Sequence, residues 1–534
     1  MFRLTYEATL MVPWINFAVY QIALRWTDDM EALPTYLEGF WLSGGGTMGI
    51  PILVMLSTFL ALGTTIVYRI WLHPLSGFPG PKCCSVSSIP VAWAQLRGRN
   101  HEFVSSLHKK YGSVVRISPS ELSFISGAAW NDIYSRSKGR PALERDRTFF
   151  NDMLVDPETI TMANEATHTR IRRSMAPAFS PRALLEQEPI IQANINLLMD
   201  KLEARAGSGG APTDLRAWFN YTTFDLIGDL AFGESFGCLA TSTCHEWVQF
   251  VLDHFYTSTL LHVVHRFRPF NRVLAALVPK SLIEKRKAHD SMTLAKVHRR
   301  LEVQARRNDF TQHLLDAAEA GTLSPREVEK QASVLILAGS ETTSVALTFA
   351  IYLVLTHKPV LDQLNDELHS TFKEEQAINL LSVNHLKYLH AVIQETLRFC
   401  PPISNGFPRQ TPPQGATVDG MFIPGKTVVN INHWAAYRSP RNFTLPEQFL
   451  PERWLGDPRF DEDAKDVFQP FSVGPRNCIG KKFAYDSMKL ILAKFLWRFK
   501  PTLLDKSRSW LDHQPTFVSF HQPPLLVDLE IQGQ

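Results

Sequence analysis

Cysteine is scarce in this chain: its 534 residues include only six, and these form neither a C-x-x-C pair nor a regular framework. This scarcity argues against a disulfide scaffold and a structural zinc site, so we expect reduced cysteines in a domain that faces the cytosol. A net charge of only +3 gives no electrostatic case for binding nucleic acid. The sequence also has no internal repeat, no low-complexity tract and no G-x-G-x-x-G dinucleotide fingerprint.

The remaining composition is that of an ordinary globular protein, with 45% hydrophobic and 20% charged residues. A chain of this length can form several domains or one large enzyme body. In either case the apolar residues suffice for a sizeable hydrophobic core.

The N-terminal region contains an uncharged apolar stretch, residues 49–68. About 20 such residues cross roughly 30 Å of hydrocarbon, so we predict a transmembrane helix, with a buried core helix as the alternative. Basic residues follow this stretch and acidic residues precede it, which predicts that its C-terminal side is cytosolic. Residues 8–24 are apolar but interrupted, and they form a second span, an interfacial helix or an additional leader.

A proline- and glycine-rich segment, residues 69–82, follows the predicted span and reads as a stiff hinge. The chain is therefore expected to comprise an N-terminal segment (1–48), a transmembrane helix (49–68), the hinge and a catalytic domain (83–534).

Cys478 lies in the sequence FSVGPRNCIG, between Gly474 and Gly480. The glycines allow a tight turn that a flat ligand can approach, Arg476 can donate to a carboxylate, and Phe471 can cover a ligand face. A strongly helical segment follows, so the thiol lies before a helix N-terminus, which favours the thiolate. Such a thiolate is a soft ligand for iron; a buried thiol without a function is the alternative.

The same stretch matches the F-x-x-G-x-R-x-C-x-G signature of the cytochrome P450 superfamily, and the chain resembles this family from the hinge to the C-terminus. The resemblance implies that Cys478 is the axial ligand of the iron of haem b. It also implies that Arg476 contacts a haem propionate and that Phe471 contributes to the cofactor site.

Glu395 and Arg398 are spaced i, i+3 in an apolar helical segment, which places them on one helix face. Alone, such residues usually form a surface ion pair that adds little stability. The superfamily, however, carries E-x-x-R on a helix behind the haem pocket, locked to a later arginine, and Arg453 in the sequence PERW matches that arginine. The resemblance therefore implies a structural network rather than a catalytic group.

Residues 324–356 read as one long helix that starts with a capping box and has a polar centre, LAGSETTS. A glycine and a glutamate in the middle of an apolar helix are costly, and a local break that opens the helix toward a ligand explains both. The centre resembles the superfamily's A/G-G-x-D/E-T-T/S motif. This implies that Glu341 and Thr342 are the acid–alcohol pair that delivers protons during dioxygen activation; a polar kink in a core helix is the alternative.

The sequence HTRIRR places His168 and Arg172 one helical turn apart, where they could converge on one anion or form a solvated basic face. It resembles a superfamily helix in which an aromatic residue or histidine and an arginine bind the haem propionates. Histidine stands here where tryptophan is commoner. Arg409 matches the position of a further propionate-binding arginine.

The hydrophobic patterns predict a mainly α-helical domain with small β-sheets. Helical patterns dominate residues 101–356, for example 102–112 and 181–203, whereas 113–125 and 426–432 are strand-like. This combination agrees with the cytochrome P450 fold, a helical prism, preceded by an N-terminal transmembrane anchor.

The resemblance implies an NADPH-dependent monooxygenase that uses dioxygen to hydroxylate or epoxidise a lipophilic small molecule. The chain is similar to membrane-bound fungal members, many of which act on secondary metabolites such as terpenoids, polyketides or alkaloids. Candidate substrate-lining segments are 218–236 and 403–407. The alternatives are a haem-thiolate isomerase or dehydratase that uses no dioxygen, whose members commonly lack the acid–threonine pair, and a non-enzymatic membrane haem sensor.

The chain contains no recognisable flavin domain or ferredoxin cluster, so electrons must come from another protein. By resemblance this partner is a membrane-bound NADPH–cytochrome P450 reductase, and Arg476, Lys481 and Lys482 form a candidate docking patch. We expect a single-pass or two-pass protein of the endoplasmic reticulum membrane with its catalytic domain in the cytosol.

Overall fold

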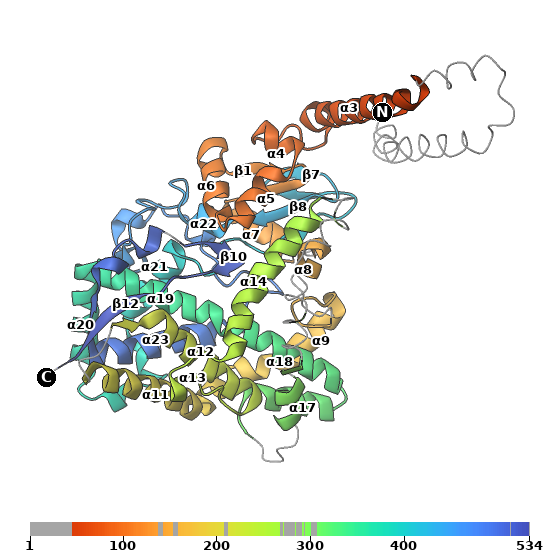
Figure 1. Cartoon of the computed structure of the whole chain (residues 1–534). Helices are drawn as coiled ribbons and strands as arrows, with labels where there is room; N and C mark the ends of the chain where they lie inside the picture. The colour runs from red at the N-terminus through yellow and green to blue at the C-terminus, as the bar shows by residue number, and fades with distance from the viewer. Residues whose placement is uncertain are drawn as a thin grey trace. The chain divides into compact units, whose positions relative to one another are not determined.

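The computed structural model describes residues 45–136, 143–152, 158–207, 212–267, 294–300, 307–512 and 514–532, and a few single positions between 271 and 292. The chain divides into two compact units, Met1–Gly77 and Phe78–Gln534 (Figure 1). The first unit contains the predicted anchor, and the second contains all the predicted site residues.

The described part of the first unit is one apolar helix. Helix α3 (Gly45–Val67) continues as a π-helical stretch, Tyr68–Leu72. The portion Pro51–Leu72 has a mean hydropathy of 1.8 and exposed side chains, which suits a membrane anchor, as predicted. The helix continues past residue 68, so the proline- and glycine-rich segment begins at His73. The apolar stretch 8–24 lies outside the described residues.

The second unit is mainly helical with small sheets, which confirms the predicted fold class (Figure 1). Its helices are α4 (Lys82–Val86), α5 (Ile89–Leu96), α6 (Asn100–Tyr111), α7 (Gly127–Tyr134), α8 (Arg147–Asp152), α9 (Glu165–Met175), α10 (Pro181–Glu186), α11 (Glu188–Gly207), α12 (Leu215–Phe232), α13 (Cys238–Thr241), α14 (Glu246–His265), α17 (Phe310–Glu319), α18 (Pro325–Gly339), α19 (Glu341–Thr356), α20 (Lys358–Thr371), α21 (Lys387–Phe399), α22 (His433–Tyr437) and α23 (Lys481–Arg498).

Two predicted elements are divided in the structure. The helical pattern 181–203 forms α10 and α11, because Pro189 has no N–H with which to continue the hydrogen bonding of α10. The strand-like pattern 113–125 forms two antiparallel strands, β1 (Val114–Ser118) and β2 (Glu121–Phe124).

The largest sheet has the strand order β1-β2-β8-β5-β3, and β2 pairs with β8 (Val428–Ile431) in parallel. At its other edge, β3 (Glu144–Arg145) pairs with β5 (Arg409–Gln410), so that Arg145 lies opposite Arg409. The smaller sheets contain β4 (Thr213–Asp214), β12 (Leu526–Ile531) and β9 (Phe499–Leu503); β6 (Ala416–Val418) and β7 (Met421–Ile423); and β10 (Thr516–Phe517) and β11 (Ser519–Phe520).

Helices α18 and α19 form the predicted long helix, and the predicted capping box at Ser324 is present. This helix is apolar enough to span a membrane, but 83% of its most apolar window is buried, so it is a core helix. Its regular path is interrupted at Ser340, as the polar centre predicted. A Cβ on Gly339 would lie 2.6 Å from Ile227 Cδ1, so α12 approaches closely there and a larger residue at 339 would displace the Ile227 side chain.

Candidate functional site

The loop that carries Cys478 is fixed by backbone hydrogen bonds before α23 begins. The N–H of Cys478 donates to the carbonyl of Phe471 at 2.9 Å, and that of Asn477 donates to Gly474 at 3.2 Å. Gly474 has φ +76°, and a Cβ there would lie 2.2 Å from the carbonyl oxygen of Tyr134. The glycine that the sequence signature contains is therefore needed for both its conformation and its packing against α7.

The Cys478 thiol experiences opposing influences on its pKa. Burial raises the pKa, whereas the N–H of Gly480 and the charges of Arg172 and Lys481 lower it. Many protein atoms surround the Cys478 thiol, which is why burial affects its pKa. Cys478 is nevertheless exposed on one side, so it borders an open space. Ala338 is likewise exposed, near the C-terminal end of α18 and directly after four buried residues.

A cluster of cationic side chains lies near this loop. Burial is the main cause that lowers the pKa of Arg145, and the charges of Arg476 and Arg409 lower it further. Burial and the neighbouring arginines likewise lower the pKa of His168, to about 3. Arg409 Nε and Arg476 Nη1 are buried and have no hydrogen-bond partner among the described residues. Concentrated buried positive charge with unsatisfied donors fits an anionic ligand, and the two propionates of haem are suitable carboxylates.

The structure brings together three of the predicted propionate ligands, His168, Arg409 and Arg476, and adds Arg145. Nothing in the sequence around Arg145 forms a motif, and only the pairing of β3 with β5 places it beside Arg409. Arg172 also makes a contact that the sequence did not predict: its Nη1 and Nη2 donate to the carbonyl and Oδ1 of Asn477 at 2.7 and 2.6 Å. It therefore braces the cysteine loop.

Phe471 and the predicted docking patch have defined neighbours. The Phe471 ring packs against Tyr485 of α23, with centroids 5.1 Å apart. Lys482 pairs with Asp486 at 2.8 Å, and Arg476 donates to the carbonyl of Ala163, also at 2.8 Å. Lys481 remains exposed and is the predicted patch residue best placed to meet a partner.

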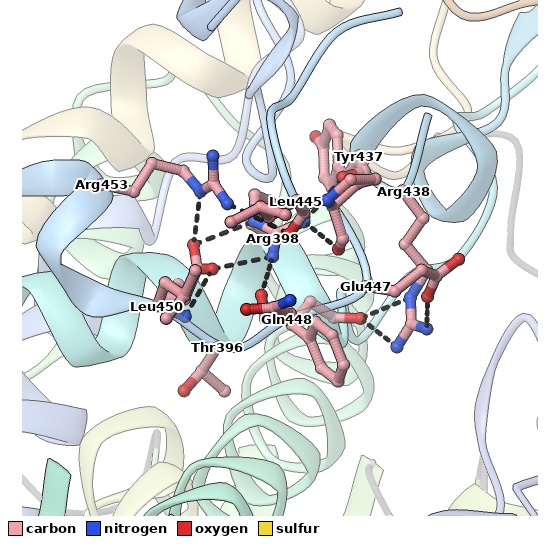
Figure 2. Close-up of polar contacts among 12 residues, drawn as sticks. Thr396, Arg398, Tyr437, Arg438, Leu445, Glu447, Gln448, Leu450 and Arg453 are labelled. Atoms are coloured by element: carbon pink, nitrogen blue, oxygen red, sulfur yellow. Dashed lines mark hydrogen bonds and ion pairs between the residues drawn. The ribbon is translucent and has the colours of Figure 1, made fainter. Parts of the chain in front are cut away.

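Glu395, Arg398 and Arg453 form a fully buried network. Arg398 donates two hydrogen bonds to the Glu395 carboxylate, at 2.9 and 2.7 Å, and Arg453 Nε lies 3.5 Å from Oε2 of the same group. Figure 2 shows Arg398 also reaching the carbonyl groups of Tyr437 and Gln448, at 2.8 and 2.9 Å. The network thus ties α21 to the segment that precedes the cysteine loop.

Two members of this network were missed by the sequence analysis. Arg453 Nη1 donates to Asp463, and Trp454 Nε1 donates to Glu395 at 2.9 Å. Each arginine of the network therefore meets a carboxylate, as buried charges require. Asp463 lies in a charged run, DED, whose composition alone reads as a solvated surface.

Glu341 and Thr342 begin α19 immediately after the interruption at Ser340. Thr342 is half-buried, and its hydroxyl donates to the carbonyl of Ala338 at 2.8 Å. The Glu341 carboxylate is buried and accepts a hydrogen bond from Asn220 Nδ2 at 3.0 Å. Burial raises the pKa of Glu341 to about 7, opposed by Arg216 and Asn220 on α12.

The raised pKa of Glu341 predicts a pH-dependent effect of Glu341→Gln on stability. The pKa is about 4.5 in the unfolded chain and about 7 in the folded protein. The free energy of unfolding of the native protein therefore falls as pH rises between these values. At pH 8 the variant should therefore have the larger free energy of unfolding, by on the order of 3 kcal/mol. The gain should shrink toward pH 5 in urea-unfolding measurements.

Glu327→Gln provides a control of opposite sign. Its hydrogen bond with Arg170 lowers the pKa of Glu327 to about 2, so this carboxylate stabilises the fold above pH 4.5 and loses that effect on acidification. The Gln variant should be less stable at pH 8. A pH-independent difference for Glu341→Gln would contradict the assignment of its raised pKa.

A pocket with mostly aromatic walls borders Glu341. It has a volume of about 170 Å³, and we call it the aromatic pocket; its lining residues are Phe255, Tyr256, Glu341, Phe517, Ser519, Phe520 and His521. These residues come from α14, α19 and the β10–β11 hairpin. The predicted lining segments 218–236 and 403–407 are not among the residues that line this pocket, and α12 is packed in the core against α19.

Comparisons with known proteins agree with this geometry. Residues 81–530 match the family model "Cytochrome P450". The chain is 96% identical over 504 residues to "Cytochrome P450 monooxygenase astD" of Aspergillus oryzae, covering 94% of this chain and 98% of that protein. It is 39% identical over 472 residues to "Trichothecene C-15 hydroxylase" of Fusarium sporotrichioides, covering 88% and 95%.

It is also 39% identical over 470 residues to "Averantin hydroxylase" of Dothistroma septosporum, covering 87% of this chain and 88% of that protein. The predicted family, cofactor and reaction class are thereby confirmed, and the chain lies among fungal monooxygenases of secondary metabolism. The chain therefore belongs to the cytochrome P450 family and is a haem-thiolate monooxygenase that depends on dioxygen and NADPH.

Proposed function

We propose that Cys478 ligates the haem iron and that His168, Arg145, Arg409 and Arg476 hold the propionates. The observation that carries this proposal is the cationic cluster beside the exposed sulfur, where Arg409 and Arg476 each have a buried unsatisfied donor within the described residues. Arg172 and the bracketing glycines then hold the loop so that the sulfur points at the cofactor.

Bound haem with a thiolate ligand supplies the oxidising chemistry that cleaves dioxygen. Within the chain, Glu341 and Thr342 move the protons that this reaction consumes. A carboxyl with a pKa of about 7 can hold and release a proton at neutral pH, and the hydroxyl of Thr342 follows it directly along α19. Near the interruption at Ser340, Ala338 is exposed and Thr342 is half-buried, which favours an open path for water.

Thr342→Ala should uncouple NADPH consumption from product formation. Without the hydroxyl, protons arrive at the wrong place, so product per NADPH should fall by roughly a factor of ten or more while peroxide increases. Thr342→Ser keeps the hydroxyl and should retain coupling. The measurement is NADPH, peroxide and product in one reaction, and tight coupling in Thr342→Ala would remove this residue from the mechanism.

The substrate is a lipophilic secondary metabolite, such as a terpenoid, polyketide or alkaloid, that is hydroxylated or epoxidised. Two relatives are named as hydroxylases, and the aromatic pocket offers apolar walls to such a molecule. The electron donor is an NADPH–cytochrome P450 reductase, and the anchor holds the protein in the endoplasmic reticulum membrane with its catalytic unit in the cytosol.

One experiment tests reaction, partner and location together. The full chain is expressed with a fungal reductase, and the microsomal fraction is supplied with NADPH and extracts of candidate metabolites. Oxygenated product should form only when both proteins and NADPH are present, and it should sediment with the endoplasmic reticulum marker. Product formation without NADPH would instead support the isomerase or dehydratase alternative.

A further inference from the structure

Ser519 carries a buried hydroxyl that is unpaired within the described residues. It is 3% exposed, and its Oγ has no hydrogen-bond partner in the part of the chain that the structure describes. It lines the aromatic pocket together with Glu341. Burying a hydroxyl without a partner costs free energy, and a ligand atom that completes its hydrogen bond recovers that cost.

The hairpin that carries Ser519 holds an unusual conformation. Phe517 pairs with Ser519, so Val518 alone forms the tip, with φ +72°. A β-branched residue strongly disfavours this region, and such strain is typical of functional sites whose surroundings enforce it. The strained turn fixes two pocket-lining side chains, Phe517 and Ser519, on either side of Val518.

Three further hydrogen bonds hold this hairpin in place. The N–H of Thr516 donates to the carbonyl of Gly98 at 2.8 Å, and that of His521 donates to Pro515, also at 2.8 Å. Gln522 Nε2 donates to the carbonyl of Val345 in α19 at 3.2 Å. Since the hairpin is tied to the helix that carries Glu341, Ser519 and Glu341 share one rigid frame.

We propose that Ser519 and Glu341 form the polar end of the aromatic pocket and bind an alcohol group on the substrate. This rests on the proposed function, because it specifies the substrate of the same site. An alcohol both donates and accepts, so it pairs with the Ser519 hydroxyl and with Glu341 in either protonation state. The substrate is then a lipophilic molecule that already carries a hydroxyl, which an earlier oxygenation or carbonyl reduction must supply.

The test uses two probes, menthol and p-menthane, which differ by one hydroxyl. Their dissociation constants are measured on the full-length haem protein in detergent from the substrate-induced shift of the Soret absorption. Wild type should bind menthol about tenfold more tightly than p-menthane, the effect of one hydrogen bond to a buried group. In Ser519→Ala this preference should disappear through weaker menthol binding, while p-menthane binding is unchanged.

Ser258→Ala is a matched control. Ser258 is also a buried serine with an unpartnered hydroxyl among the described residues, but it is not among the residues that line the aromatic pocket. Its substitution should leave the menthol preference intact. Thermal unfolding of both variants separates a local effect from misfolding.

Three outcomes overturn the proposal: a menthol preference that persists in Ser519→Ala, an equal loss of affinity for both probes, or no shift with either probe in wild type. The spectrum of the reduced, carbon monoxide-bound protein distinguishes these from a failure of the proposed function. If that spectrum shows thiolate ligation, the haem assignment stands and only the polar subsite is lost.

Discussion

Cys478→Ala should reduce product formation to background and abolish the red-shifted Soret absorption of the reduced, carbon monoxide-bound protein. The thiolate is the electron-donating ligand that the oxygen chemistry requires, and alanine offers none. Burial raises the pKa of the Cys478 thiol, and the N–H of Gly480 with the charges of Arg172 and Lys481 opposes that rise and supports the anion that an iron ligand must be.

Cys83→Ala is the control for this substitution. Cys83 is an exposed free cysteine at the start of α4 and contributes to no part of the candidate site. Its replacement should leave the spectrum and the product yield unchanged. Wild-type protein that lacked the red-shifted absorption would contradict the assignment of Cys478, whatever the variants showed.

Glu395→Ala should strongly destabilise the fold. Its carboxylate pairs with Arg398 and also accepts hydrogen bonds from the N–H of Leu450 at 3.0 Å and from Trp454. Removing it leaves two guanidinium groups buried with one fewer counter-charge, and breaking a buried pair costs about 3–5 kcal/mol. Because a whole domain is stable by only about 5–15 kcal/mol, the loss should appear as low soluble yield and a lower urea midpoint.

Glu447→Ala is the matched control in the same region. Glu447 accepts a hydrogen bond from Arg438 at 2.8 Å but is about half exposed (Figure 2). Exposed ion pairs contribute less than about 1 kcal/mol to the free energy of unfolding, so this variant should fold normally. Equal destabilisation by the two substitutions would show that burial does not decide the importance of the Glu395 network.

The helix break and the capped start of α18 followed from local sequence, since a capping box and a glycine act within a few residues. The division of residues 181–203 at Pro189 was missed for a different reason. The apolar pattern continues across Gln187 and Pro189, so periodicity alone does not reveal where the helix divides.

The sequence by itself determined the family and the reaction class, and it predicts the cysteine ligand and the acid–threonine pair, because these residues lie in short motifs whose spacing is set by the covalent chain. Only the tertiary structure decided which charges meet. It placed Arg145 beside Arg409, turned Arg172 onto the cysteine loop, joined Asp463 to Arg453 and Asn220 to Glu341, and placed Ser519, whose hydroxyl is buried, in the lining of the same pocket as Glu341. Burial increases both the strength of an interaction between charges and the free-energy cost of an unpaired polar group severalfold. Burial itself depends on neighbours that lie far apart in sequence.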